Sequence, residues 1–329
     1  MAIHKIPNSV YTELAITEGP IPPQAQDWIS IFLGILVEAT PFLLLGVVVS
    51  SLVHVFVSED TLLRYVPKNP ILSLIPALFL GVLMPVCECG NVAVARRFLA
   101  KGVPISTCIA FLLAAPILNP VALFATATAF RFQPDMVWLR GGLAFLIAAS
   151  VGLIVGHFGR GEELLSAAVA ADRNHDHSDA HHHHHQHNQG GVGAKLALAA
   201  DGAGHEFLGM LQVLLIGAGV AAATQVLIPR AAITSLGSGI VFAIIAMMSL
   251  AFVLSICSTV DAFFALSYSA LFPTPALLAF LVLGPMLGMK STALMLTAFR
   301  PRTVLAIAAL TAEMVFVAAL LLNLRGVLL

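Results

Sequence analysis

The chain has 329 residues, of which 59% are hydrophobic and 10% are charged, and its mean hydropathy is +0.96. Soluble domains are nearer half apolar and a quarter charged, so this composition excludes a soluble globular protein. The formal net charge of −1 excludes the basic surface that binds nucleic acid, and we expect no nucleic-acid partner.

Eight apolar stretches are each long enough to cross a bilayer, which takes about 20 apolar residues. They lie at about 28–57, 71–100, 104–130, 137–158, 205–228, 239–271, 275–299 and 302–325. The sequence therefore predicts an all-α polytopic membrane protein with about eight helices. The first 27 residues lack the apolar core and cleavage site of a secretory signal, so we expect the spans themselves to direct the chain to the cell inner membrane.

A polar stretch divides these spans into two halves. We predict an N-terminal tail (1–27), a first transmembrane repeat (28–158), a His-rich hydrophilic linker (159–204) and a second transmembrane repeat (205–329). Residues 42–46 resemble 213–217, residues 89–92 resemble 257–260, and residues 110–116 resemble 279–285, at offsets of 168 to 171 residues. The nearly constant offset predicts an internal repeat, that is, two four-helix repeats.

Proline and glycine interrupt the central spans of both halves. The residues concerned are Pro85, Gly90, Pro116, Pro120, Gly284, Pro285 and Gly288. Matching interruptions in two halves of a membrane protein predict a transporter binding site near the midplane, because irregular backbone at that depth must line a cavity. The alternative is that the prolines only kink the helices.

The distribution of Lys and Arg bears on orientation. If all eight stretches cross, the two sides hold eight and seven basic residues, and the positive-inside rule cannot choose. If the second and sixth stretches re-enter as hairpins, the side of the linker holds ten and the other five. The repeats are then inverted and the linker is cytoplasmic.

The segment 84–91 is the most informative in the chain. Cys87 and Cys89 could share one ligand only where the backbone is extended, since residues two apart face opposite sides of a helix. Glu88 would lie at mid-span, where a carboxylate needs a partner, a proton or a cation. All four cysteines lie in apolar surroundings, so we interpret them as thiols, with Cys108 a small core residue.

The matching segment of the second half contains Cys257, Ser258, Thr259 and Asp261. If helix resumes directly after the break, Cys257 and Asp261 lie on one helix face. Thiolates together with carboxylates suit Zn²⁺, Cu⁺ or a trivalent metalloid.

Other polar residues inside the spans have two interpretations each. Lys290 could neutralise Glu88 or Asp261, or attract an anion; Glu38 could relay protons or satisfy backbone freed by Pro41. We expect His54 and Glu313 near span ends. The predicted translocation residues are Glu38, Cys87, Glu88, Cys89, Asn91, Asn119, Cys257, Ser258, Thr259, Asp261 and Lys290, with no catalytic residue.

The linker segment 174–187 holds eight of the twelve histidines. Its candidate metal ligands are His175, His177, His181, His182, His183, His184, His185 and His187. Imidazole at this density predicts reversible binding of Zn²⁺ or a similar transition metal, as a buffer or sensor. An affinity tag is the alternative, although tags stand at chain ends; no other cofactor is expected.

Several motifs in order resemble the predicted permease family that includes the bacterial ArsP and YraQ proteins. They are residues 38–46, 85–90, 95–97, 101–104, 111–120 and 255–261. The resemblance implies an inner-membrane permease of about eight helices, with one branch exporting trivalent organoarsenicals and others linked to metal homeostasis. It assigns the family's cysteines to Cys87, Cys89 and Cys257; where the family often has proline soon after Cys-Gly, this chain has Asn91.

Three functions follow as hypotheses. The first is a secondary transporter or facilitator for a thiophilic, zinc-like metal ion, since no ATP-binding motif is visible. The second is an organoarsenical exporter, and the third is a membrane subunit that docks a soluble or membrane partner. We expect no enzyme, because the sequence lacks His-Glu-x-x-His and evident Ser-Lys or Ser-His pairs; a homo-oligomer is compatible with the sequence.

Overall fold

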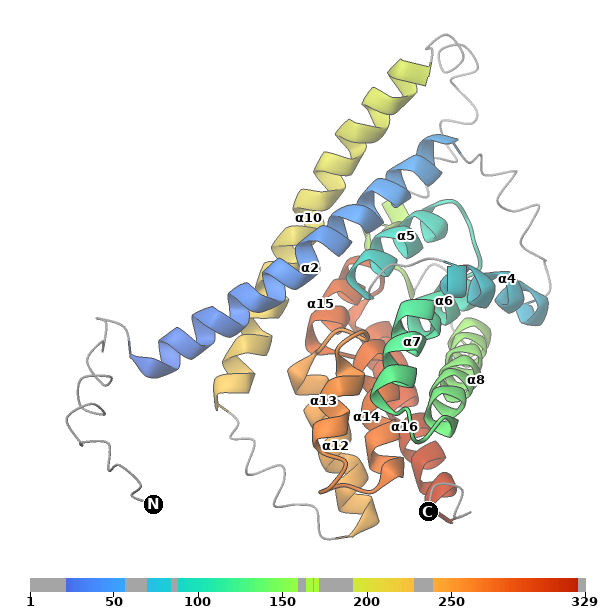
Figure 1. Cartoon of the computed structure of the whole chain (residues 1–329). Coiled ribbons are helices and arrows are strands. Elements are labelled where there is room, and N and C mark those ends of the chain that lie inside the picture. The colour runs from blue at the N-terminus through green and yellow to red at the C-terminus, as the bar shows by residue number, and fades with distance from the viewer. Residues whose placement is uncertain are drawn as a thin grey trace.

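The structure is a computed structural model that describes residues 22–56, 70–83, 88–158, 164–167, 169–171, 192–227 and 239–324. The secondary structure of these residues is helical apart from an isolated bridge between Leu165 and Phe299. The helices in Figure 1 are α2 (Pro23–Phe56), α4 (Pro70–Leu83), α5 (Glu88–Ala100), α6 (Ile105–Leu118), α7 (Pro120–Ala129), α8 (Asp135–Phe158), α10 (Val192–Leu227), α12 (Ile240–Leu254), α13 (Asp261–Ser267), α14 (Thr274–Met286), α15 (Met289–Ala298) and α16 (Pro301–Leu324). The predicted all-α class is confirmed, and α10 begins inside the stretch expected to be linker.

Six helical segments of the described chain are long and apolar enough to cross a membrane: α2, α6 with α7, α8, α10, α14 with α15, and α16. Large apolar side chains on them face outward, such as Phe124, which is 71% exposed, and Ile216, which is 69% exposed. These side chains are suited to a hydrocarbon surrounding rather than to water. The chain is therefore a multi-pass membrane protein.

The sixth apolar stretch is a re-entrant hairpin rather than a crossing. Helix α12 packs beside α14, with Ala251 against Gly284 and, one turn later, Ser255 against Gly288. The two helices thus run in the same direction, so the chain between them must turn back. Helix α13 makes this return.

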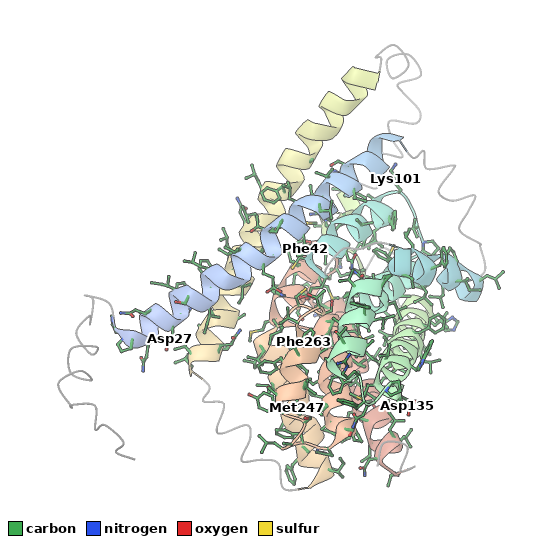
Figure 2. All side chains as sticks on the ribbon, viewed as in Figure 1. Asp27, Phe42, Lys101, Asp135, Met247 and Phe263 are labelled. Carbon is green, nitrogen blue, oxygen red and sulfur yellow. The ribbon has the colours of Figure 1, made fainter. Side chains whose placement is uncertain are left out.

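The second stretch has the same arrangement in the first half. Thr107 near the start of α6 donates a hydrogen bond of 2.9 Å to Ser73 near the start of α4, and Gly81 later in α4 lies against Ala115 of α6. These parallel contacts again require the intervening chain to turn back, and α5 makes the return. Figure 2 shows Lys101, before α6, and Asp135, after α7, at opposite ends, so α6 and α7 together run from one end of the protein to the other.

Among the described residues, six helical segments are thus long enough to cross, and the second and sixth of the eight apolar stretches form hairpins instead. The breaks divide the second and sixth stretches into helices of 14, 13, 15 and 7 residues, each shorter than the roughly 20 that a crossing takes. Each half has three crossings and one hairpin, so the two halves enter the membrane from opposite sides. In agreement, α2 and α10 lie side by side and run in opposite directions (Figure 1).

The two broken crossings form the centre of the protein. Over an apolar window of 18 residues, 72% of the residues are buried in α6–α7 and 83% in α14–α15, against 28–33% in the other four crossings. Helix α5 packs on α15, α6 on α14, and α7 on α13, so the broken elements of the two halves meet one another, while α2 with α10 and α8 with α16 also join the halves.

Glycines allow the two long outer helices to lie close to this centre. A Cβ on Gly46 of α2 would lie 2.3 Å from the Cα of Gly90 in α5. A Cβ on Gly217 of α10 would lie 2.9 Å from the Cβ of Ala293 in α15. A hydrogen bond of 3.1 Å from Trp28 Nε1 to the Gly219 carbonyl joins α2 to α10.

Candidate functional site

Four short helices begin where the central segments are interrupted. They are α5 at Glu88, α7 at Pro120, α13 at Asp261 and α15 at Met289. They meet in pairs from opposite halves, α5 with α15 and α7 with α13. The predicted breaks thus exist, although Pro116 and Pro285 lie inside helices and the interruptions fall at Asn119 and at Leu287–Gly288.

The first pair of helices is joined by an ion pair. Lys290 Nζ of α15 lies 3.0 Å from Glu88 Oε1 of α5, and both side chains are buried. The expectation that Lys290 neutralises one of the two central carboxylates is confirmed for Glu88. Burial of both charges makes the pair interdependent, because either one left alone would be an uncompensated charge.

A second buried ion pair joins the halves at Asp261. Arg140 of α8 donates to Asp261 Oδ2 at 2.5 Å, to Thr126 Oγ1 at 2.6 Å and to the Ser258 carbonyl at 3.5 Å. The Arg140 side chain is fully buried. Arg140 is not among the residues predicted from the sequence, although its place inside the apolar stretch 137–158 is a signal of an intramembrane charge.

Two thiols lie beside the interruptions that precede α5 and α13, one from each half. Cys89 is in the first turn of α5 and Cys257 lies between α12 and α13, and both are buried. Both are within electrostatic range of the Lys290 ammonium. Cys108 is a buried residue of α6, and Cys87 is outside the described residues.

Helix does not resume directly at Cys257, which was the condition for Cys257 and Asp261 to lie on one helix face. Helix α12 ends at Leu254, and the next residue, Ser255, adopts a left-handed conformation (φ 47°). The next helix begins only at Asp261, whose N–H donates to the Cys257 carbonyl at 3.0 Å. Cys257 therefore precedes α13, and its carbonyl is bonded to the first residue of that helix. Ser255 Oγ accepts a hydrogen bond of 2.5 Å from the Met289 N–H, which fixes the hairpin tip to the start of α15.

Several buried polar atoms around the ion pairs have no hydrogen-bond partner among the described residues. They are Glu88 Oε2, both amide atoms of Asn91, Asp261 Oδ1, Ser291 Oγ and Arg140 Nε. Buried polar groups are nearly always paired, so unpaired atoms gathered at one site are suited to a bound molecule or water. Asn91 is fully buried in α5, one turn after Glu88.

The other predicted residues have more local roles. The Asn119 side chain accepts from the Val121 N–H at 2.8 Å and caps α7, while Ser258 contributes its carbonyl to Arg140. Thr259 is half-buried between Ser258 and the start of α13. Glu38 of α2 is half-buried and within electrostatic range of Lys290 and Glu88.

A metal centre is not assembled from the residues that the structure describes: no three His, Cys, Asp or Glu side chains among them are grouped closely enough to hold an ion. The eight candidate histidines of 174–187 lie outside these residues. Metal binding by that segment stays a prediction.

Comparisons with known proteins agree that the chain is a multi-pass membrane protein. Residues 24–324 match the ArsP_1 family of predicted permeases, and the chain belongs to that family. It is 42% identical to UPF0718 protein YcgR of Bacillus subtilis over 84% of the chain and 90% of the relative. It is 36% identical, over 87% of the chain and 91% of the relative, to a Streptococcus mutans protein named as a two-component membrane permease complex subunit. No solved structure matches. The chain is therefore a membrane permease, a transporter rather than an enzyme.

Proposed function

We propose that the chain is a secondary permease for an uncharged thiophilic species, which binds between the halves through Cys89 and Cys257. The observation that carries the proposal is the burial of one thiol from each half at a helix break, within electrostatic range of Lys290. A site between two halves is reached alternately from either side when one half moves against the other.

Charge favours a neutral substrate over a divalent cation. Glu88 and Asp261 are the carboxylates expected to balance a metal ion, and each already pairs with a buried cation, Lys290 or Arg140. The helices α5 and α15 also direct their positive N-terminal ends toward this region. A Zn²⁺ ion would therefore meet two carboxylates whose charge a buried cation already balances.

A trivalent organoarsenical fits these conditions. Its dihydroxy form, RAs(OH)₂, is uncharged, and two thiols displace the two hydroxyls to give RAs(SR)₂ and two waters without any oxidation or reduction. The substrate class is thus the one implied by the organoarsenical branch of the family. Asn91 and Ser291, whose buried polar atoms lack described partners, are suited to hydrogen-bond the hydroxyls before exchange.

The halves are proposed to be inverted repeats. Ala251 of α12 lies against Gly284 of α14, and Gly81 of α4 lies against Ala115 of α6. These pairs are separated by 170 and 169 residues along the chain, the same offset as the sequence matches, and α8 and α16 both have 24 residues. Such symmetry would let the two hairpins exchange roles as the site opens to one side and then to the other.

A transition metal is the second candidate substrate, and the His-rich segment 174–187 favours it. In that case the segment concentrates or senses Zn²⁺ and Cys87 completes the ligand set. A partner subunit is also proposed, because the Streptococcus mutans relative is named as part of a two-component complex.

Transport by purified protein in liposomes tests the proposal. We expect uptake of phenylarsonous acid that is lost in Cys89→Ser and Cys257→Ser and kept in Cys108→Ser, the matched control in α6. Zinc uptake that depends on residues 174–187, without arsenical uptake, would favour the second candidate. Absence of transport until a second subunit is added would show that the chain acts only in a complex.

A further inference from the structure

A cavity of about 590 Å³ lies between α12, α14 and α16, apart from the thiol site. Its lining is apolar except for Ser249 and Glu313. Phe252 and Met248 of α12 and Phe316 of α16 are among the lining residues. Ile245 at its edge is 47% exposed, so the cavity opens toward the lipid.

Glu313 is the charged residue of this cavity and lies at the middle of α16, not near a span end as expected from the sequence. It is 12 residues from Pro301, about 18 Å along the helix at 1.5 Å per residue. Its side chain is exposed, and no described residue pairs with its carboxylate. A carboxylate at this depth in a membrane needs a partner, and intramembrane ionisable residues usually mark ligand or ion pathways.

The size and chemistry of the cavity select the kind of partner. Cavities of about 300–1,000 Å³ hold small organic ligands, whereas a helix of a partner protein needs a long groove. A hydrated inorganic cation would need several oxygen ligands, and the lining supplies one carboxylate and one hydroxyl. An organic cation with an apolar body would bury that body against Phe252 and Phe316 and gain cation–π attraction.

We propose that this cavity is a binding site for a lipophilic organic cation, with Glu313 as its counter-ion. The cation enters from the bilayer, and its apolar body fills the space between α12 and α16. The inner wall is formed by Leu283 and Leu287, at the end of α14, so a bound cation contacts the segment that leads to the central break. The site does not involve the thiols, so its test is independent of the test of the proposed substrate.

Binding of two ions of equal shape and opposite charge tests this site. The purified full chain is placed in phosphatidylcholine nanodiscs, and binding of radiolabelled tetraphenylphosphonium and tetraphenylborate is measured by equilibrium dialysis, with empty nanodiscs subtracted. We expect saturable binding of one tetraphenylphosphonium per chain and at least tenfold weaker binding of tetraphenylborate. Equal binding of the two ions would overturn the proposal.

Variants separate charge from shape. Glu313→Gln should weaken tetraphenylphosphonium binding at least tenfold, and Glu313→Asp should keep most of it. Ala312→Trp should block the cavity without a change in charge, whereas Asp135→Asn, at an exposed carboxylate outside the cavity, should have no effect. Unchanged binding in Glu313→Gln would show that the carboxylate is not the counter-ion.

Discussion

Lys290 and Glu88 are opposite charges that pair inside the protein, each on a different half. Their side chains are 2% and 4% exposed, and the atoms Nζ and Oε1 are 3.0 Å apart. Removal of water from both ions costs free energy that their mutual attraction largely offsets. The pair is therefore a fixed contact between the halves, and its loss exposes the remaining charge to an apolar surrounding.

Replacement of Lys290 by Met should be strongly destabilising. Loss of one partner of a buried pair typically lowers the free energy of unfolding by about 3–5 kcal/mol. The double variant Lys290→Met, Glu88→Gln should recover most of this loss, because no buried charge remains. Unfolding in mixed micelles would measure the free energy of unfolding of the unchanged protein, of Lys290→Met, of Glu88→Gln and of the double variant. A double variant no more stable than Lys290→Met would contradict the ion pair.

Arg140 should not tolerate replacement by Lys. The guanidinium donates to Thr126, Asp261 and Ser258 in three directions, and a single ammonium cannot reproduce this fork. We expect Arg140→Lys to lower the free energy of unfolding by about 1–3 kcal/mol, the cost of unsatisfied buried groups. Thr126→Val, which keeps the ion pair, should cost less; equal effects of the two variants in the same unfolding assay would show that Asp261 does not depend on the guanidinium.

The residues of the site differ in how far the sequence could identify them. Glu88 and Lys290 are charges deep inside apolar stretches, and their cost in a membrane was enough to predict that they need partners. Arg140 is only three residues from the start of its stretch, so its pairing with Asp261, 121 residues away, appears only when α8 and α13 are placed together. The positions of Cys257 and Asp261 depended on where α13 begins, which neither proline nor glycine marks.

At the scale of elements, the breaks were predictable and the direction of the chain after them was not. Proline and glycine indicated interruptions in the central stretches, and both broken crossings are present. Hydropathy counts apolar residues but does not distinguish one crossing from two short antiparallel helices. The parallel packing of α4 with α6 and of α12 with α14 supplied that information.

The close contact of α2 with α5 should depend on Gly46. A Cβ at this position would lie 2.3 Å from the Gly90 Cα, a backbone atom that cannot move alone. We expect Gly46→Ala to lower the midpoint of thermal unfolding, with a loss of about 1–3 kcal/mol from overpacking. Gly34→Ala is the matched control in the same helix, because nothing lies within 4 Å of its Cβ position.

The control variant should be neutral or slightly stabilising, since alanine favours helix over glycine by up to about 1 kcal/mol. Fluorescence-detected size-exclusion chromatography of heated samples would compare the two variants. Equal midpoints of thermal unfolding for Gly46→Ala and Gly34→Ala would show that the packing of α2 on α5 does not depend on Gly46.

At the scale of the whole molecule, six crossings give a definite distribution of charge. Six crossings assign each Lys and Arg to one side of the membrane by its position along the chain. Ten are then expected on the side of the segment between α8 and α10. Four are expected on the other side, because Arg140 is buried. Basic residues are retained on the cytoplasmic side of membrane proteins. The segment that contains the histidines should therefore be cytoplasmic.

Reporter fusions would test this orientation. Alkaline phosphatase, which is active only outside the cytoplasm, should be inactive when fused at residue 180 and active when fused at residue 232. A cytoplasmic fluorescent reporter should give the opposite pattern. The same result at both positions would contradict the six-crossing arrangement, since a single crossing, α10, separates them.

We propose that Cys89 of the first half and Cys257 of the second bind one thiophilic molecule. The most direct measurement is intact mass spectrometry of purified Cys87→Ser protein treated with phenylarsine oxide in the presence of excess monothiol. We expect one arsenic per chain, held by two thiols, that is lost in Cys89→Ser or Cys257→Ser and kept in Cys108→Ser. An adduct that survives Cys257→Ser, or no stable adduct at all, would contradict it.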